Sequence, residues 1–237
     1  MFSHVFAATV VVSFVLLGLW QWSRHNWRAD LNAEIEARST APALEVSDAL
    51  DRPVEELDYR AATGPGSYVD GDLVRVANRS QGGVAGEHMV ALFRLDDGQL
   101  ILVNRGFVPV NTDVELVGAP TGPVTVTGWL RASAEPGWFG PADSGEGDVV
   151  PRLDVDAIES RVGEPLAPVW LQLAGSGDAA ATSREFPDPV PLPELDGGPH
   201  LSYMGQWFIF AVLGTLFYGA LLRRQSRQSA AAVAQPI

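Results

Sequence analysis

Two uncharged apolar stretches lie near the ends of the chain, and a long region of mixed polarity separates them. The first runs from Val5 to Trp22 and the second from Tyr203 to Leu222. A membrane-spanning helix needs about 20 consecutive apolar residues, and both stretches reach that length. We therefore predict transmembrane helices over residues 4–23 and 203–222, a domain over 24–202 between them, and a tail over 223–237.

The first stretch has an alternative interpretation as a cleaved signal peptide. No basic residue precedes it, it is longer than a usual signal core, and the bulky sequence WQWSRHNWR follows it. A signal peptide has a basic start, a shorter core and a cleavage site of small residues. The pattern therefore favours an uncleaved anchor.

The region between the anchors shows the two-residue alternation of β-strands. We predict strands over residues 59–69, 72–79, 87–95, 100–110, 123–131 and 167–174, with a Gly-Pro-Gly break inside the first. Asp97-Gly98 is a good hairpin turn, and the continuously apolar 100–110 segment is typical of a central strand. The predicted fold class is an α+β membrane protein, with two transmembrane helices flanking a β-rich extracytoplasmic domain that is an antiparallel barrel or sandwich.

Helices and loops complete this domain. LNAEIEAR (31–38) continues the first anchor as a helix, 45–57 adds a short helix, and Asp154 is a candidate N-cap for 153–163. Two loops interrupt the strands: a Gly-, Pro- and acid-rich loop at 133–148, and a Pro-rich linker at 174–199 that favours an extended spacer. We expect the tail after Arg227 to be disordered.

Arginines set the expected orientation. Arg223, Arg224 and Arg227 follow the second apolar stretch with no acid nearby, which places that end in the cytoplasm by the positive-inside rule. Two spans then place both termini in the cytoplasm and the central domain outside the plasma membrane. Arg24 and Arg28, which follow the first apolar stretch, would favour the opposite orientation, but acidic residues follow them within a few positions.

Composition excludes several functions. The 237 residues carry a net charge of −13, so nucleic acid is not an expected partner. The chain has no Cys and therefore no disulfide, thiolate metal site or covalently attached haem. No catalytic motif is present, so we do not expect an enzyme, and His88 is interpreted as a surface or edge residue of a strand.

His200, at the entrance of the second apolar stretch, is the candidate for chemistry. Tyr203, Trp207 and Phe210 follow it at helical spacing, so a flat macrocycle bound to an imidazole is one interpretation, and an aromatic belt at the membrane surface is the other. Met204 leaves the helix on the same side as His200 and cannot be its opposite axial ligand. His25 lies at a similar depth on the other anchor, so a bis-His site is geometrically allowed but not favoured. Arginines at this level meet either haem propionates or lipid phosphates.

Four motifs, in order along the chain, resemble the Surfeit locus protein 1 family of cytochrome c oxidase assembly factors. Gly18, Trp20, Gln21 and Arg24 match its Gly-x-Trp-Gln-x-x-Arg signature, and GSYVDGDLVRVANRSQGGVAG (66–86) resembles the start of its main sheet. DDGQLILVNRGFVP (96–109) is similar to its most recognisable motif, and HLSYMGQWFIFA (200–211) to its His-x-x-Tyr-x-x-Gln-Trp-Phe pattern. Arg131 and Glu135 also fit. The departures are Phe107 in place of Trp, and Met204 with Gly205.

The resemblance implies a role in maturing a haem–copper oxidase, when haem a enters its catalytic subunit. It implies haem a as a transient cofactor, with His200 as the iron ligand, and the oxidase subunit, the haem a synthase and membrane lipid as partners. The expected cofactor-binding residues are His200, Tyr203, Trp207, Gln206, Trp20, Gln21 and Arg24. The alternative function is a membrane scaffold that stabilises an oxidase intermediate without binding haem.

Overall fold

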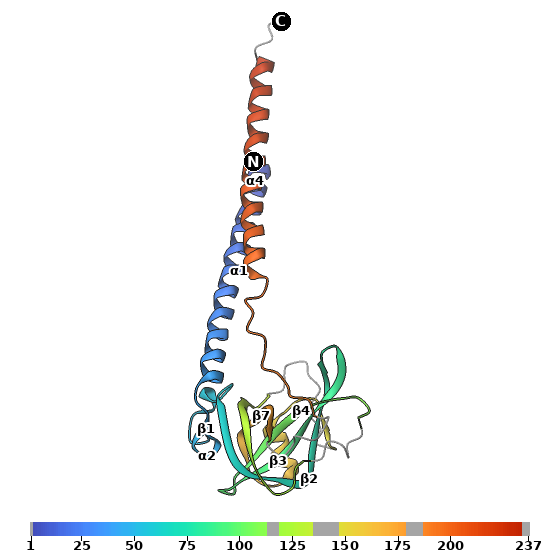
Figure 1. Ribbon diagram of the computed structural model, residues 1–237. Helices are drawn as coiled ribbons and strands as arrows, with labels where there is room; N and C mark the ends of the chain where they lie inside the picture. The colour runs from blue at the N-terminus through green and yellow to red at the C-terminus, as the bar shows by residue number, and fades with distance from the viewer. Residues whose placement is uncertain (1, 113–118, 135–146, 179–186, 234–237) are drawn as a thin grey trace. The chain divides into compact units, whose positions relative to one another are not determined.

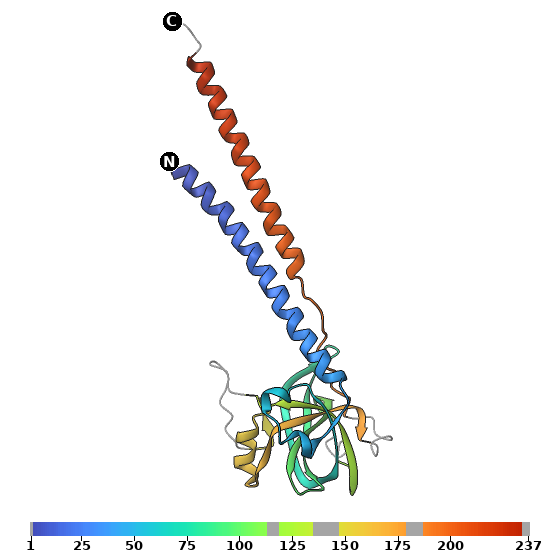
Figure 2. The ribbon, with the colours of Figure 1, turned by 90° about the vertical axis from the view of Figure 1, so that its left-hand side faces the viewer.

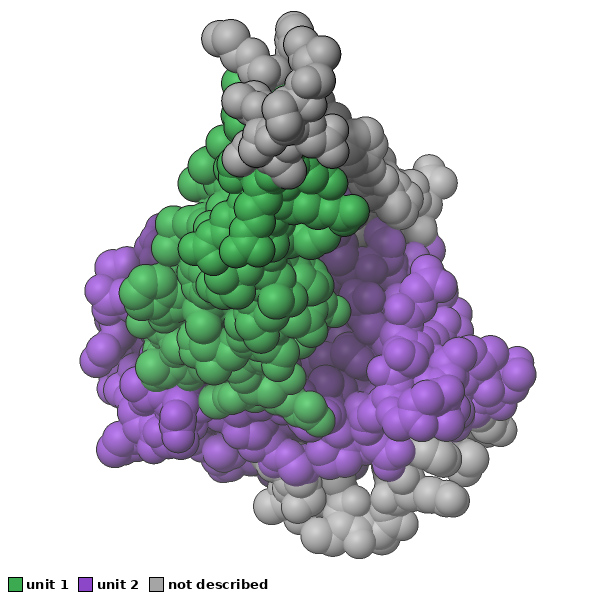
Figure 3. Space-filling model, turned by 90° about the horizontal axis from the view of Figure 1, so that it is seen from above, with its two compact units in different colours: residues 1–34, 194–237 green, residues 35–193 purple. Residues whose placement is uncertain are grey.

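The computed structural model describes residues 2–112, 119–134, 147–178 and 187–233. The chain forms two compact units (Figure 3): unit 1 comprises residues 1–34 and 194–237, and unit 2 comprises residues 35–193. Helix α1 (Phe2–Thr40) contributes to both units, and helix α4 (His200–Val233) belongs to unit 1.

Unit 2 is built on a β-barrel. Its sheet has the strand order β1-β2-β3-β4-β7-β5, and an additional pairing between β2 and β5 closes it. The long strands are β2 (Ala61–Gln81), β3 (Val84–Leu95), β4 (Leu100–Pro109), β5 (Pro123–Ala132) and β7 (Leu166–Asp178). The short strands β1 (Leu44–Glu45) and β6 (Val149–Val150) both pair with β2. Figures 1 and 2 show this sheet curling round on itself. The predicted α+β class is confirmed, and the β-rich domain contains a barrel.

Strand β2 closes the barrel, and here the predicted Gly-Pro-Gly break is wrong. The strand is continuous through Gly64, Pro65 and Gly66, and pairs with β5 over its first part and with β3 over its last. A Cβ atom on Gly66 would lie 2.2 Å from the carbonyl oxygen of Arg94. The glycine therefore permits a close approach of two backbones rather than a turn.

The expected hairpin and central strand are confirmed. The turn between β3 and β4 is closed by the bond from Gly98 N to Leu95 O (2.8 Å), with Gly98 at φ 92°. Nine of the ten residues of β4 are buried, and β4 lies between β3 and β7. The barrel is not wholly antiparallel, however, because β4 and β7 are parallel. The chain crosses over between them through β5, β6 and helix α3 (Val155–Val162), a connection that alternation alone cannot indicate.

Two apolar clusters fill unit 2. The larger gathers residues from β2, β3, β4, β5 and β7, with Phe93, Ile101 and Leu130 fully buried, and helix α2 (Val46–Ala49) covers it with Val46. The smaller includes Ile158 and Val155 of α3 against β2 and β3. The Asp154 side chain caps α3 by accepting a bond from Ala157 N (3.3 Å), as predicted. A 3-10 turn, η1 (Val54–Glu56), precedes β2.

A strap after the barrel, residues 187–193, is bonded to β4 and β7. Phe107 and Asp188 exchange backbone hydrogen bonds of 2.7 and 2.8 Å, and Gln172 donates to Val190 O at 2.8 Å. A Cβ on Gly106, which has φ 139°, would lie 2.3 Å from Asp188 O. The Asn-Arg-Gly motif thus gives the strap access to the backbone of a central strand.

Helices α1 and α4 are long and apolar enough to cross a membrane. Both exceed the predicted spans: α1 continues to Thr40, as LNAEIEAR indicated, and α4 continues to Val233 through much of the tail that we expected to be disordered. Alanine-rich sequence after Ser229 supports that extension because Ala is the best helix former. Strand β7 reaches Asp178, into the range predicted as linker. Most of the 133–148 loop, with Glu135, and residues 179–186 lie outside the described residues.

Candidate functional site between the two apolar helices

Helices α1 and α4 of unit 1 pack side by side and antiparallel (Figures 1 and 2). Gln21 contacts His200, Phe14 contacts Trp207, and His4 contacts Tyr218, so residue numbers rise on one helix as they fall on the other. The less exposed positions recur at alternating intervals of three and four on each helix, which is a coiled-coil type of spacing. The series with this spacing is 7, 11, 14, 18, 21, 25, 28 and 32 on α1 and 200, 204, 207, 211, 214 and 218 on α4, and flanking positions 10 and 15 on α1 and 205, 208 and 219 on α4 are less exposed as well.

The middle of this pair is close-packed. Gly18 is buried, and a Cβ atom there would lie 2.9 Å from the ring of Phe208. The rings of Phe14 and Trp207 stack with their centroids 5.7 Å apart. A small residue at a helix contact lets the backbones approach, which is how membrane helices gain packing energy. The Gly of the Gly-x-Trp-Gln-x-x-Arg signature is therefore a helix-packing residue.

His200 and Gln21 meet one turn beyond Gly18. The distance between His200 Nδ1 and Gln21 Oε1 is 2.9 Å. An amide oxygen only accepts hydrogen bonds, so the Nδ1–H of the imidazole must donate. A neutral imidazole with its proton on Nδ1 carries its lone pair on Nε2. The pair thus presents Nε2 as the nitrogen available to a ligand, the arrangement in which a second group orients a metal-binding histidine.

Two glycines before α4 lie next to the imidazoles of His200 and His25. A Cβ on Gly198, which has φ 62°, would lie 3.5 Å from His200 Nε2, and one on Gly197 would lie 3.5 Å from His25 Cε1. The Nδ1 atom of His25 is buried and makes no hydrogen bond in the structure. Glycine at 198 therefore leaves the Nε2 side of His200 free of a side chain. The imidazole of His25 lies on the same face of α1 as Gln21.

An ion pair fixes the segment that leads into α4. Arg28 donates to the Asp196 carboxylate at 2.9 Å and to its backbone oxygen at 3.0 Å, and Asn32 donates to the same backbone oxygen at 2.8 Å. Sequence reasoning assigned Asp196 only to the linker and gave Asn32 no role. The signal was available, because Gln21, His25, Arg28 and Asn32 continue the three-and-four spacing of the apolar face of α1 with polar residues.

The other predicted site residues lie away from the contact between His200 and Gln21. Tyr203 is 47 % exposed and Trp20 is 56 % exposed. Gln206 is exposed as well, and the Arg24 guanidinium lies 4.3 Å from the Trp27 ring centroid on its own helix. Met204, one position along from Tyr203, takes the place facing α1. Of the seven residues, the structure therefore brings only His200 and Gln21 into contact. Trp207 lies two turns further along the same helix interface, against Phe14, and the other four are on outward faces.

A polar cluster in unit 2 surrounds Arg131, one of the residues that fit the family motifs. Arg131 donates to Asp58 Oδ1 (3.0 Å), Gln172 Oε1 (3.1 Å) and the Tyr59 hydroxyl (3.0 Å), and Gln172 continues to the strap. Arg105 is 4 % exposed, and its guanidinium lies 5.4 Å from the Tyr68 ring centroid. Both arginines are bound within the domain, which supports a structural role for the barrel motifs rather than a reactive one.

The chemistry open to the helix site is ligand binding. Among the described residues, no group of three or more His, Asp or Glu side chains could hold a metal ion. A single imidazole with a free Nε2 suits a metal that is already held by another chelate, and haem iron is such a metal. The orienting Gln21 and the absence of a side chain at Gly198 are both compatible with such a group.

Comparison with known proteins extends this picture. The sequence profile of the SURF1 family matches residues 8–212. The chain belongs to the SURF1 family. Surfeit locus protein 1 of Rattus norvegicus is 27 % identical over 228 residues, covering 88 % of this chain and 72 % of the relative. Surfeit locus protein 1 of Homo sapiens is 27 % identical over 237 residues, covering 87 % and 73 %. An uncharacterized SURF1-like protein of Mycobacterium tuberculosis is 26 % identical over 239 residues, covering 95 % and 85 %.

The predicted family is confirmed, and membership supports a role in oxidase assembly in general. The matched range includes the Gly18–Arg24 signature, the barrel and the His200 motif. One helix of membrane-spanning length precedes the barrel in the sequence and another follows it, so the chain has the features of a membrane protein.

Proposed function

We propose that this SURF1-family protein helps to insert haem a into the catalytic subunit of a haem–copper oxidase, with His200 as the iron ligand. The observation that carries the proposal is the hydrogen bond from His200 Nδ1 to Gln21 Oε1, which joins two separate motifs and leaves Nε2 free. No catalytic group is needed, so the protein acts as a carrier rather than an enzyme.

The residues around His200 have separate roles in this proposal. Gln21 holds the imidazole in one tautomer, and Gly198 places no side chain against Nε2. Trp207 offers an aromatic surface two turns into the helix. Arg28 is already paired with Asp196, so Arg24 is the arginine at this level that could meet a propionate. His200 would bind the iron of the haem through Nε2, and a single protein ligand would suit a cargo that must be released.

The proposed function depends on the location of the protein in the membrane. We propose that the protein lies in the plasma membrane, with both termini in the cytoplasm and unit 2 outside. A hydrophobic haem would then reach the helix pair from its synthase, and leave for the oxidase catalytic subunit, without crossing water. Tyr203, Gln206 and Trp20 lie on outward faces and would contact lipid or a partner helix rather than His200.

The test is the haem content of the purified protein. The chain is co-expressed with a haem a biosynthesis pathway, purified in detergent, and its haem extracted and its absorption spectrum recorded. We expect wild type to retain haem a, His200→Ala to lose it at least about tenfold, and Gln21→Ala to retain an intermediate amount. His4→Ala is the matched control, because His4 bonds Tyr218 at the other end of the helix pair.

Two outcomes would redirect the proposal. Full retention of haem by His200→Ala would rule out ligation by His200, and parallel loss in His25→Ala would identify a bis-His site. A wild-type protein that carries no haem a, yet still co-purifies with the oxidase subunit, would favour the scaffold function. In that case His200 serves only as the hydrogen-bonding partner of Gln21.

A further inference from the structure

A groove on unit 1 begins between the two helices and ends in a cluster of arginines. Its inner part, of about 360 Å³, is lined by Val11 and Val15 of α1 and by Phe208, Ala211 and Val212 of α4, with Thr215 and Leu216. Its outer part, of about 660 Å³, shares Thr215 and Leu216 and continues past Gly219 and Ala220. The outer part is also lined by Arg223, Arg224, Arg227 and Gln228.

The inner part offers almost no hydrogen bonding. Thr215 is its one side chain with a polar atom, and that hydroxyl donates to the Ala211 carbonyl at 2.8 Å. Gly219 has no atom within 4 Å of the position where a Cβ would lie, which keeps the passage open. A hydrocarbon chain is the kind of ligand that such a surface accepts, because burying it leaves no polar group unpaired.

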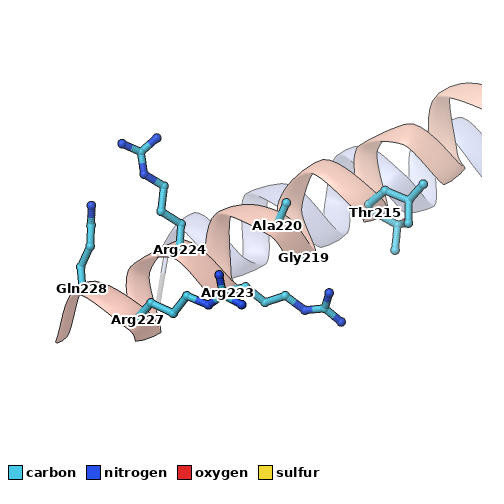
Figure 4. Close-up of a pocket in the computed structure, with 8 residues that line it drawn as sticks. Thr215, Gly219, Ala220, Arg223, Arg224, Arg227 and Gln228 are labelled. Atoms are coloured by element: carbon cyan, nitrogen blue, oxygen red, sulfur yellow. The ribbon is translucent and has the colours of Figure 1, made fainter. Parts of the chain in front are cut away.

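The outer part is cationic without any compensating acid. All three arginines are exposed, and α4 contains no Asp or Glu from His200 to Val233. Figure 4 shows Arg223 and Arg227 directed along the helix toward the Thr215 end, and Arg224 projecting to the other side. Guanidinium groups bind phosphate oxygens through paired hydrogen bonds, so this end is complementary to an anionic phosphodiester.

The length of the groove matches one leaflet of a bilayer. Ala211 and Arg223 are 12 positions apart, which is about 18 Å along a helix. Half of the hydrocarbon core of a bilayer is about 15 Å thick. An acyl chain lying along Ala211 and Thr215 would therefore place its headgroup at the arginines.

We propose that this groove is a binding site for an anionic phospholipid, with one acyl chain between α1 and α4 and the phosphate on Arg223 and Arg227. The site lies at the opposite end of the helix pair from His200 and is independent of haem binding. A bound lipid would fill the space between the helices and hold their spacing at this end.

The test is lipid binding by the full-length protein in detergent, followed by native mass spectrometry during titration with phosphatidylglycerol or phosphatidylcholine. We expect phosphatidylglycerol to bind at one preferred site and phosphatidylcholine to bind more weakly. Arg223→Gln with Arg227→Gln should weaken phosphatidylglycerol binding about 10- to 30-fold. Gly219→Leu, which keeps the charge and fills the passage, should weaken it as well.

The controls decide between a site and general attraction. Arg24→Gln removes a cation at the other end of the pair and should leave phosphatidylglycerol binding unchanged. Equal binding of the two lipids, an equal loss in Arg24→Gln, or displacement of the lipid by excess inorganic phosphate would each overturn the proposal. Circular dichroism confirms that every variant keeps its helix content, so a weaker signal reports binding rather than unfolding.

Discussion

At the scale of single residues, the hydrogen bond of one side chain determines the tautomer of another. His200 has two ring nitrogens, and its hydrogen bond to the amide oxygen of Gln21 decides which one carries the proton. The two residues are 179 positions apart and come from separate motifs. Gln206 is exposed, so Gln21 is matched with the imidazole.

This pairing predicts the tautomer of His200 in the protein without haem. In nitrogen-15 NMR spectra of the histidine-labelled protein at neutral pH, the His200 signal should report a proton on Nδ1. Gln21→Leu removes the acceptor, and the signal should move toward a mixture of tautomers. Gln206→Leu, on the outward face of α4, is the control. An unchanged His200 signal in Gln21→Leu would show that the hydrogen bond does not hold the ring.

His88, on strand β3, shows the same principle in unit 2. Burial, and secondarily the Arg79 charge, lower its pKa from 6.5 to about 4. Asn104 Nδ2 donates to its Nδ1 at 3.3 Å, and Asn104 Oδ1 accepts from Gly106 N, which shapes the bulge at the strap. Our interpretation of His88 as a plain surface or edge residue was therefore incomplete. Its role depends on Asn104, 16 positions away.

The His88 pKa predicts a pH dependence of stability. Between about pH 6.5 and pH 4 the unfolded chain binds a proton that the folded chain rejects, so stability falls as pH falls through this window. After allowance for the partly exposed ring, the contribution is about 1–2 kcal/mol. Thermal melts of the full chain in detergent should show a shallower decline for His88→Gln than for wild type. Parallel declines in the two proteins would contradict the assignment, since the carboxylates titrate equally in both.

At the scale of elements, the helix pair has a defined register. A Cβ on Gly214 would lie 3.5 Å from Cγ2 of Val11, which is close to where the sulfur of a cysteine at position 11 could lie, so a disulfide between the two positions is within reach. The chain contains no Cys, so two introduced cysteines can only pair with each other within a monomer. Val11→Cys with Gly214→Cys should therefore cross-link on mild oxidation, seen as a mobility shift that reductant reverses.

The matched control moves one cysteine by a single position. Val12 is 54 % exposed on the outer face of α1, so Val12→Cys with Gly214→Cys should cross-link far more slowly. Equal cross-linking of both pairs would mean that α1 rotates freely against α4.

Sequence patterns predicted the elements better than their partners. Strands, the Asp97-Gly98 turn and the Asp154 cap depend on neighbouring residues, and all three were predicted. The parallel pairing of β4 with β7, and the passage of β2 through Gly64–Gly66, depend on contacts between distant segments. On α4, Tyr203 and Met204 are adjacent and fit helical spacing with His200 equally well. Only the position of α1 decides between them, so the spacing selected Tyr203 where the structure selects Met204.

At the scale of the whole molecule, charge is divided between the two units. Unit 2 holds 25 of the 29 acidic residues and 11 of the 16 arginines, so its net charge is −14 and that of unit 1 is +1. The few charges of unit 1 lie outside its apolar faces, at Arg24 to Glu34, at Glu194 and Asp196, and at Arg223 to Arg227. A chain with this division suits a membrane anchor joined to a water-exposed acidic domain.

The division predicts opposite accessibility for the two units. Arginines close to a span retain that end in the cytoplasm, and acidic residues have little influence on orientation. A single cysteine at Thr121→Cys, in unit 2, should react with a membrane-impermeant maleimide in intact cells. A single cysteine at Ser226→Cys, between Arg224 and Arg227, should react only after permeabilisation. Both positions are exposed, so burial cannot explain a difference. The reverse pattern would place the Arg223–Arg227 cluster outside, with Arg24 and Arg28 as the cations that orient the chain.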